Sequence, residues 1–238
     1  MATYPVRLKK VSHRIPAREM GSAPAAETRY RILDAAEELF MRHGFEGTTL
    51  RQITAAAKVN LAAVHYHFGS KEVLMQAVLT RRLDPMNQER VRLLDESEAQ
   101  GKPLTCEKIL SAMFIPALKL ARDRERGGNN FLKLLGRAYS DPAPFIRDFL
   151  SEQYRPMITR YKAAFAKALP HLPKQELTWR LHFTMGAIST ALAGTDPIKL
   201  IASLNPRQLG NDEMLLKRLV PFLAAGLKAP LPDFDELV

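Results

Sequence analysis

The sequence predicts an all-α protein, and three observations support this fold class. Apolar residues recur every three to four positions almost everywhere from Thr28 onward, which is the spacing of one helix face. Short clusters of Gly, Pro, Asn and Asp separate these periodic segments. No two-residue alternation bounded by hairpin turns occurs, and there is no internal repeat. We therefore expect a small N-terminal unit of three helices, joined by a long helix to a larger helical bundle.

The first predicted helix begins at Thr28 and ends at Gly44. Its apolar face consists of Ile32, Leu33, Ala36, Leu39 and Phe40. A glycine at this point favours the left-handed backbone that often terminates a helix. Thr49 with Gln52 three residues later has the pattern of a capping box, which predicts the start of a second helix.

Polar caps also predict the next two helices. Asn60 can cap a short third helix that ends at Gly69, and Ser70 can cap a fourth over about residues 71–92. Two short helices separated by a tight turn and braced by a preceding longer helix form a helix-turn-helix. The N-terminal unit is therefore expected to contain this motif.

The rest of the chain predicts longer helices, over about residues 104–122, 129–140, 142–168, 173–194 and 211–228. We divide the chain into a basic disordered arm, a helix-turn-helix domain and a larger helical domain, with expected ranges 1–27, 28–74 and 75–238.

Charge and composition narrow the class of protein. The formal net charge is +10 over 238 residues, which favours an anionic partner. Residues 1–18 hold five basic side chains and no acidic one. Such an arm either adds phosphate or minor-groove contacts to DNA binding or is a solvated tail, and both interpretations stay open. No apolar run approaches the roughly 18–20 residues of a membrane span, and no secretory signal is recognisable, so we expect a cytoplasmic protein without a membrane partner.

The tripeptide His65-Tyr66-His67 raises the question of a metal or catalytic site. Two histidines two positions apart on a helix point about 200° apart, so they cannot share one ion. Cys106 is the only cysteine, which excludes a CxxC zinc site and an intramolecular disulfide. No nucleophile elbow and no phosphate-binding glycine loop occurs. We expect no metal, no cofactor and no catalytic activity.

The third helix instead has the pattern of a DNA recognition helix. Leu61, Val64 and Phe68 are expected to face inward. The remaining side chains then face outward, and they are Ala62, Ala63, His65, Tyr66 and, less centrally, His67. Small residues allow close approach to a major groove, and ring N–H and O–H groups can reach base edges or phosphates.

The stretch from Ile32 to Leu79 resembles the DNA-binding domain of the TetR family of bacterial repressors. The matching marks are "IL.AA..LF" from residue 32, "GF..TT" from residue 44, "I...A" from residue 53 and "VHYHFGSKE" from residue 64. The family usually has "LYHYF" after a Gly-Thr pair, whereas this chain has "VHYHF" after two alanines. The base preference is therefore not carried over.

The resemblance implies DNA contacts at particular positions. Thr48, Thr49 and Lys71 match phosphate-binding positions, and a helix N-terminus favours an anion. Arg51 could reach phosphate or a base edge. His67 matches a backbone-contacting position, and the base-reading and groove-lining positions fall on Asn60, Ala62, Ala63, His65 and Tyr66. The alternative for each is a capping or packing role only.

The resemblance further implies a C-terminal bundle that binds a small molecule and dimerises through its last two long helices. In agreement, residues 211–228 are apolar on more than one face, although packing within one subunit is the alternative. An apolar ligand site with a few polar groups is expected at Met113, Phe114, Phe131, Leu135, Tyr139, Trp179, Phe183 and Met185, with Arg180, His182 and Arg137 as polar groups. The alternative is ordinary core. The C-terminal part also resembles the fatty-acid-degradation branch of the family, which implies a fatty acid or acyl-CoA effector.

The sequence thus predicts a ligand-responsive repressor that binds a near-palindromic operator as a homodimer, with recognition helices about 34–36 Å apart. Two alternatives remain, a non-specific DNA-binding, architectural or membrane-surface protein driven by charge, and a helical small-molecule enzyme.

Overall fold

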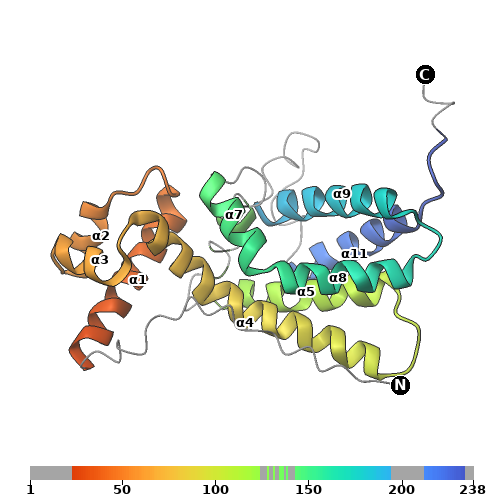
Figure 1. Cartoon of the computed structure of the whole chain (residues 1–238), viewed down its shortest axis with the longest axis horizontal. Helices are drawn as coiled ribbons and strands as arrows, with labels where there is room; N and C mark the ends of the chain where they lie inside the picture. The colour runs from red at the N-terminus through yellow and green to blue at the C-terminus, as the bar shows by residue number, and fades with distance from the viewer. Residues whose placement is uncertain are drawn as a thin grey trace. The chain divides into compact units, whose positions relative to one another are not determined.

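The structure is a computed structural model that describes residues 23–123, 128, 131, 134–136, 138, 143–193 and 212–233. All regular structure within these ranges is helical, which confirms the predicted fold class (Figure 1). The helices are α1 (Ala23–His43), α2 (Leu50–Ala57), α3 (Leu61–Phe68), α4 (Lys71–Ala99), α5 (Cys106–Arg122), α7 (Pro144–Gln153), α8 (Arg155–Ala168), α9 (Lys174–Ala193) and α11 (Asp212–Lys228). No described helix is long and apolar enough to cross a bilayer.

The chain forms two compact units. One holds the chain up to Leu79 together with Asp148–Pro156, and the other holds Thr80–Arg147 and the chain from Met157 onward. The division falls within α4, five residues after the domain boundary expected at residue 74. Because α4 is one continuous helix, no loop marks a boundary there that the sequence could signal.

The first helix starts earlier than predicted. It begins at Ala23, so residues 23–27 of the expected arm are helical. Proline is well tolerated in the first turn of a helix, where Pro24 lies. Thr28, the predicted start, lies inside the helix, and its hydroxyl donates to the Pro24 carbonyl, one turn back, at 2.9 Å. The rest of the expected arm, residues 1–22, lies outside the described residues.

The later helices correct two predictions. The fourth helix continues to Ala99, seven residues beyond the expected end. The expected helix over 142–168 is two helices, α7 and α8. Pro156 favours a break here, because a proline cannot donate the hydrogen bond that would continue α7 and its ring clashes with the preceding turn. Proline alone does not decide it, since Pro85, Pro116 and Pro221 lie inside continuous helices. The predictions for α5, α9 and α11 are correct to within two residues. Most of the predicted helix 129–140 lies outside the described residues.

Each unit has its own apolar core. In the first unit α1 packs against both α2 and α3, and the fully buried side chains include Ile32, Phe40, Ile53 and Val64. In the second unit α5, α8, α9 and α11 run alongside one another (Figure 1). Their shared core, to which α4 adds Leu94, includes Ile109, Leu110, Phe114, Phe165, Ile188, Leu223 and Leu227.

Candidate functional site

The segment from α2 to α3 forms a helix-turn-helix. The predicted capping box is confirmed, since Thr49 and Gln52 bond each other's backbone N–H groups. Lys58 ends α2 in the left-handed region with φ of 53°, and the Val59 N–H donates to the Thr54 carbonyl at 3.0 Å. The predicted cap of α3 is also confirmed, because the Asn60 Oδ1 accepts from the Ala63 N–H at 2.8 Å. These local bonds set the angle at which α3 leaves the turn.

The outward face of α3 carries small residues and rings. Val64 and Phe68 are buried as predicted, while Ala62 and His65 are exposed and Tyr66 is 72% exposed. Ala63 and His67 are half-buried at the edges of this face. The His67 ring meets the Tyr66 ring edge-on at a centroid distance of 5.0 Å, which supports the tyrosine from one side.

One ring nitrogen of His65 is already engaged. Nδ1 lies 2.8 Å from the Gly69 carbonyl at the end of α3, where Gly69 has φ of 75°. A carbonyl oxygen can only accept, so Nδ1 carries the proton in this bond. Nε2 is then an acceptor in the neutral ring and a donor in the imidazolium.

The structure separates the two predicted threonine contacts. Thr48 is fully buried, and its hydroxyl donates to the Gly44 carbonyl at 2.8 Å. The prediction of a phosphate contact by the Thr48 side chain is therefore wrong, because the hydroxyl closes the turn after Gly44, whose φ is 73°. Thr49 is exposed at the N-terminus of α2, so its role as a cap leaves it accessible to a phosphate.

Lys71 makes internal contacts that the sequence did not indicate. Its Nζ donates to the carbonyls of Phe45 and Thr48, both at 2.9 Å, and lies 4.1 Å from the centre of the Phe45 ring. The lysine thereby fastens the loop between α1 and α2 to the start of α4. Its predicted phosphate contact stays a proposal, and it would have to coexist with these bonds.

Two basic side chains that the sequence analysis did not single out support the helix-turn-helix, and one apolar residue differs from its predicted burial. Arg31 donates to the Lys58 carbonyl at 3.3 Å, and the Arg29 guanidinium lies 5.1 Å from the centre of the Phe68 ring, so both brace the motif. Arg51 is exposed on α2. Leu61 is 43% exposed, so its predicted burial is wrong. It is the first residue of α3, and periodicity cannot show whether a neighbouring helix reaches far enough to cover a helix end.

No metal site is formed by the described part of the chain, where no three His, Cys, Asp or Glu side chains gather. His65 and His67 differ in exposure and contacts, as expected for positions two apart on a helix. Cys106 is buried in the second unit, and burial raises the pKa of its thiol. That environment favours the unreactive thiol form.

The expected ligand site divides into an inner and an outer part. Phe114, Phe131 and Leu135 are buried in the second unit, and Met113 is half-buried beside its core. Tyr139 and Arg137 lie outside the residues whose side chains the structure describes.

The residues expected from α9 lie on the outside. Trp179 is 53% and Phe183 is 64% exposed, and their rings stack at a centroid distance of 5.9 Å. Met185 and His182 are exposed as well. These four side chains are therefore not part of the core of the second unit, and their predicted part in a ligand site stays a proposal. The inward face of α9 is formed instead by Leu177, Arg180, Thr184 and Ile188.

Arg180 is buried, and its guanidinium caps the C-terminal end of α11. Its guanidinium donates to the Leu227 carbonyl at 3.0 Å, to the Ala229 carbonyl at 2.6 Å and to the Pro230 carbonyl at 2.8 Å. It also pairs with Glu176 at 2.7 Å. These carbonyls at and beyond the end of α11 lack partners within the helix. The predicted role of Arg180 as a ligand anchor is therefore wrong, because its donors are used inside the protein.

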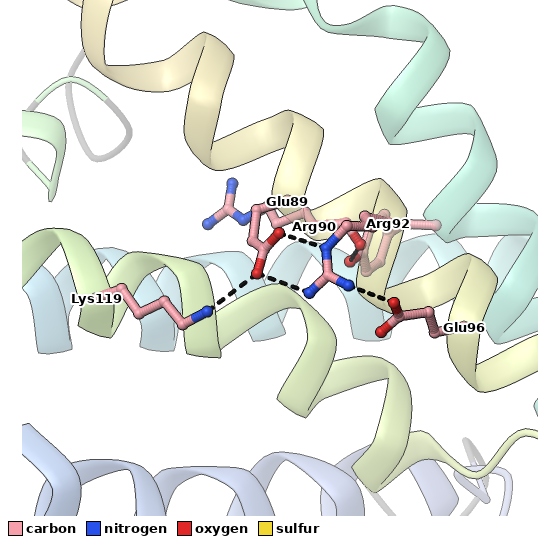
Figure 2. Close-up of polar contacts among 6 residues, drawn as sticks. Glu89, Arg90, Arg92, Glu96 and Lys119 are labelled. Atoms are coloured by element: carbon pink, nitrogen blue, oxygen red, sulfur yellow. Dashed lines mark hydrogen bonds and ion pairs between the residues drawn. The ribbon is translucent and has the colours of Figure 1, made fainter.

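Ion pairs tie α4 to its neighbours in the second unit. Glu89 accepts from Lys119 of α5 at 3.0 Å and from Arg92 at 2.6 Å, and Arg92 also pairs with Glu96 (Figure 2). These hydrogen bonds, first from Arg92 and then from Lys119, lower the pKa of Glu89 to about 2. Arg160 of α8 pairs with Asp95 and Glu98. The last turns of α4 are thus held by both α5 and α8.

Family comparisons identify both units. A family model described as "Bacterial regulatory proteins, tetR family" matches residues 32–78, and a model described as "Tetracyclin repressor-like, C-terminal domain" matches residues 111–226. The first covers the helix-turn-helix, and the second begins within α5 and ends within α11. The chain belongs to the TetR family. Members of this family are DNA-binding transcriptional regulators, which agrees with the exposed face of α3.

Curated relatives of this TetR-family chain are regulators that match over part of their length. The HTH-type transcriptional regulator SrpR of Pseudomonas putida is 46% identical over 92 residues, which are 39% of this chain and 40% of that protein. The HTH-type transcriptional repressor BepR of Brucella suis biovar 1 (strain 1330) is 36% identical over 104 residues, which are 44% of this chain and 47% of that protein. The chain thus matches less than half the length of either relative.

Solved structures agree in fold. The SmeT–triclosan complex gives a TM-score of 0.58 at 22% identity and covers 87% of this chain and 99% of that one. FadR from Bacillus subtilis in complex with stearoyl-CoA gives a TM-score of 0.58 at 15% identity and covers 83% of this chain and 98% of that one. At these identities the likeness concerns the fold alone.

Proposed function

We propose that this protein is a cytoplasmic repressor that binds a near-palindromic operator as a homodimer and is released from it by a small amphipathic effector. The observation that carries the proposal is the outward face of α3, on which Ala62, His65 and the ring of Tyr66 are exposed. A solvated helix face would normally carry lysine and glutamate, whereas small residues and polar-tipped rings suit a major groove.

The proposed DNA contacts divide into reading and positioning groups. Tyr66, Ala62, Ala63 and the Nε2 of His65 would read bases, and Leu61 at the start of α3 would add an apolar contact. Asn60 caps α3 through Oδ1, which leaves its amide N–H groups for DNA.

The positioning contacts come from the edges of the motif. Thr49, Arg51 and His67 would bind the phosphate backbone, and their side chains are exposed or half-buried. Lys71 would combine its internal bonds with a phosphate contact at the N-terminus of α4.

The proposed dimer uses exposed apolar residues on two helices that pack against each other. Trp179 and Phe183 on α9 and Phe222 on α11 are all more than half exposed. Gly186 and Gly226 lie on the same two helices, and an added Cβ at either position would meet no atom within 4 Å. Stacked aromatic rings left in water favour burial by a second subunit. A symmetric pair of such faces would form a closed interface.

We place the proposed effector site in the second unit, with the half-buried Met113 and the buried Phe114, Phe131 and Leu135 as its apolar residues. The fold is shared with a regulator solved with triclosan and with one solved with stearoyl-CoA. Both names describe apolar or amphipathic molecules, which supports this class of effector for the present chain. By linkage, DNA and an effector that releases the protein must weaken each other's binding by the same factor.

Selection from a random double-stranded DNA library, followed by footprinting at two salt concentrations, tests the proposal. A repressor of this kind should enrich one near-palindromic sequence whose half-sites lie about one helical turn apart. An architectural binder should retain DNA without enriching any sequence and with affinity set by salt alone. That second result would refute sequence-specific regulation by this chain.

A further inference from the structure

Arg90 is a buried cation, and the described part of the chain gives it no carboxylate partner. The residue is only 7% exposed on the inner side of α4. Its Nε donates to the Met113 carbonyl at 2.8 Å, and its Nη1 donates to the Asn87 Oδ1 at 2.9 Å. Both acceptors are neutral, and among the described residues no acidic side chain forms an ion pair with Arg90. Burying a charge is costly unless an opposite charge or strong hydrogen bonds compensate for it.

Arg180 shows how this fold satisfies a buried arginine that is only structural. It is equally buried, at 7% exposure, and it has the carboxylate of Glu176 and several carbonyls at the end of α11 as acceptors. Within the described residues Arg90 has two acceptors, so three of its five N–H groups are not used there. The difference between the two arginines indicates that Arg90 has a further partner.

The unused end of Arg90 borders accessible space. Its Nη2 has no hydrogen-bond partner among the described residues. In that same part of the chain, no side-chain nitrogen or oxygen is both fully buried and without a partner. Nη2 must therefore border space that a water molecule can enter, although most of the residue is covered.

The neighbouring carboxylates cannot serve as that partner while their own pairs persist. Glu89 is bonded to Lys119 and Arg92, and Glu96 is bonded to Arg92, while no dashed line reaches the Arg90 guanidinium in Figure 2. The Tyr161 hydroxyl donates to the Arg90 backbone carbonyl at 2.8 Å, which fixes this turn of α4 against α8. The Arg90 side chain is therefore held in place with its free edge available.

We propose that Arg90 binds the anionic end group of the effector, a carboxylate or a phosphate, through its free Nη1 and Nη2 N–H groups. This inference rests on the proposed function and adds the charge of the ligand to it. Two adjacent N–H groups of a guanidinium match the two oxygens of such a group. The half-buried Met113, whose carbonyl accepts from Arg90, starts the apolar surface for the rest of the ligand. Arg90 also places the bound anion on α4, the helix whose first turn contains Lys71 of the DNA-binding unit.

Calorimetric titration with three ligands of equal chain length tests this proposal. The ligands are laurate, dodecyl phosphate and uncharged 1-dodecanol, each below its aggregation concentration. Wild-type protein should bind at least one of the anions about 10-fold or more tightly than the alcohol, because hydrogen bonds to charged groups are the stronger ones. Arg90→Gln should lose about 10- to 100-fold in affinity for that anion and keep its affinity for the alcohol. Which anion binds best distinguishes a carboxylate from a phosphate.

Two further variants serve as controls. Arg92→Gln removes the same charge from an exposed position two residues away and should leave all three affinities unchanged. Arg90→Lys keeps the charge but loses the planar pair of donors, so it should bind the anion with intermediate affinity. If circular dichroism shows that Arg90→Gln does not fold, the anion affinity of Arg90→Lys tests the proposal instead.

Three results would overturn the proposal. These are wild-type protein that binds neither anion, an Arg90 variant that binds the anion as wild type does, and a variant that loses the alcohol and the anion equally. Failure here is separate from failure of the proposed function. If the protein enriches an operator but binds no anion, only the proposal for Arg90 is refuted. If the protein binds an anion through Arg90 but enriches no DNA sequence, the proposed repressor function is refuted.

Discussion

The outward faces of α3 and α9 both carry aromatic side chains, but the groups around them differ. On α3 the exposed Tyr66 has a polar tip and lies beside His65 and two alanines. On α9 the exposed Trp179 stacks on Phe183, and the ring of Phe183 has no polar atom at all. A face with polar tips can exchange water for base edges, whereas a stacked apolar face gains most from burial by another protein surface. An aromatic residue therefore indicates a function only together with its neighbours and its exposure.

The largest expected effect is on stability, and it comes from a substitution at Arg180 on the inner side of α9. Arg180→Met would leave Glu176 and the carbonyls at the end of α11 without their donor. Breaking one side of a buried ion pair costs about 3–5 kcal/mol, so we expect a loss of that size in the free energy of unfolding of the second unit. Urea denaturation followed by circular dichroism measures it. Arg92→Met, at an exposed position, should change the value by less than about 1 kcal/mol. Equal losses in both variants would contradict the role assigned to Arg180.

The next largest effect is expected on dimerisation, from a substitution at Phe183 on the outer side of α9. Phe183→Glu would place a carboxylate in each half of the proposed symmetric interface, and we expect dimer dissociation to become about 100-fold easier or more. Analytical ultracentrifugation over a concentration series measures the dissociation constant. Ala163→Glu adds the same charge to an exposed position on α8 and should have no effect. A dimer unaffected by Phe183→Glu would place the interface elsewhere.

A smaller effect is expected on the face of α3. Tyr66→Ala should weaken binding to the selected operator about 10- to 100-fold and change non-specific binding little, because a base contact is worth about 1–3 kcal/mol. Tyr66→Phe separates the hydroxyl from the ring. Tyr30→Ala removes another exposed tyrosine of the same unit and serves as the control. Fluorescence anisotropy with operator and scrambled DNA gives both affinities, and equal losses on the two DNAs would argue against base reading.

The smallest effect concerns the contacts between α4 and α5. The Glu89 carboxylate has its pKa lowered from 4.5 to about 2 by Arg92 and Lys119, so its contribution to stability is present above pH 4.5 and is lost as the pH falls toward 2. The melting temperature of Glu89→Gln should therefore lie below that of wild type at neutral pH and approach it between pH 4.5 and pH 2. Glu96→Gln removes a carboxylate with fewer contacts and should show a weaker trend. A pH-independent difference for Glu89→Gln would contradict the ion-pair explanation.

Local signals in the sequence predicted most of the first unit. The cap at Asn60, the capping box at Thr49 and the helix-ending Gly44 were identified from residues within four positions of each other, and all three are observed. Such bonds close within one turn of backbone, so a short stretch of sequence contains everything that determines them. The helix break near Pro156 could not be predicted in this way, because Pro85, Pro116 and Pro221 lie inside helices that continue.

Contacts between distant segments could not be predicted in the same way. Lys71 bonds carbonyls 26 and 23 residues away, and Arg180 bonds carbonyls between 46 and 50 residues away. Helical periodicity shows which side chains share a face, but it cannot show which face is covered or where a covering helix ends. The sequence alone therefore determined the helices, their caps and the outward direction of Tyr66. Only the tertiary structure decided that Trp179 and Phe183 are exposed, that Thr48 is buried and that Leu61 is exposed. It also decided that Arg90, rather than Arg180, is the buried arginine with unused N–H donors. Burial and partner choice depend on packing between elements that the chain brings together from far apart.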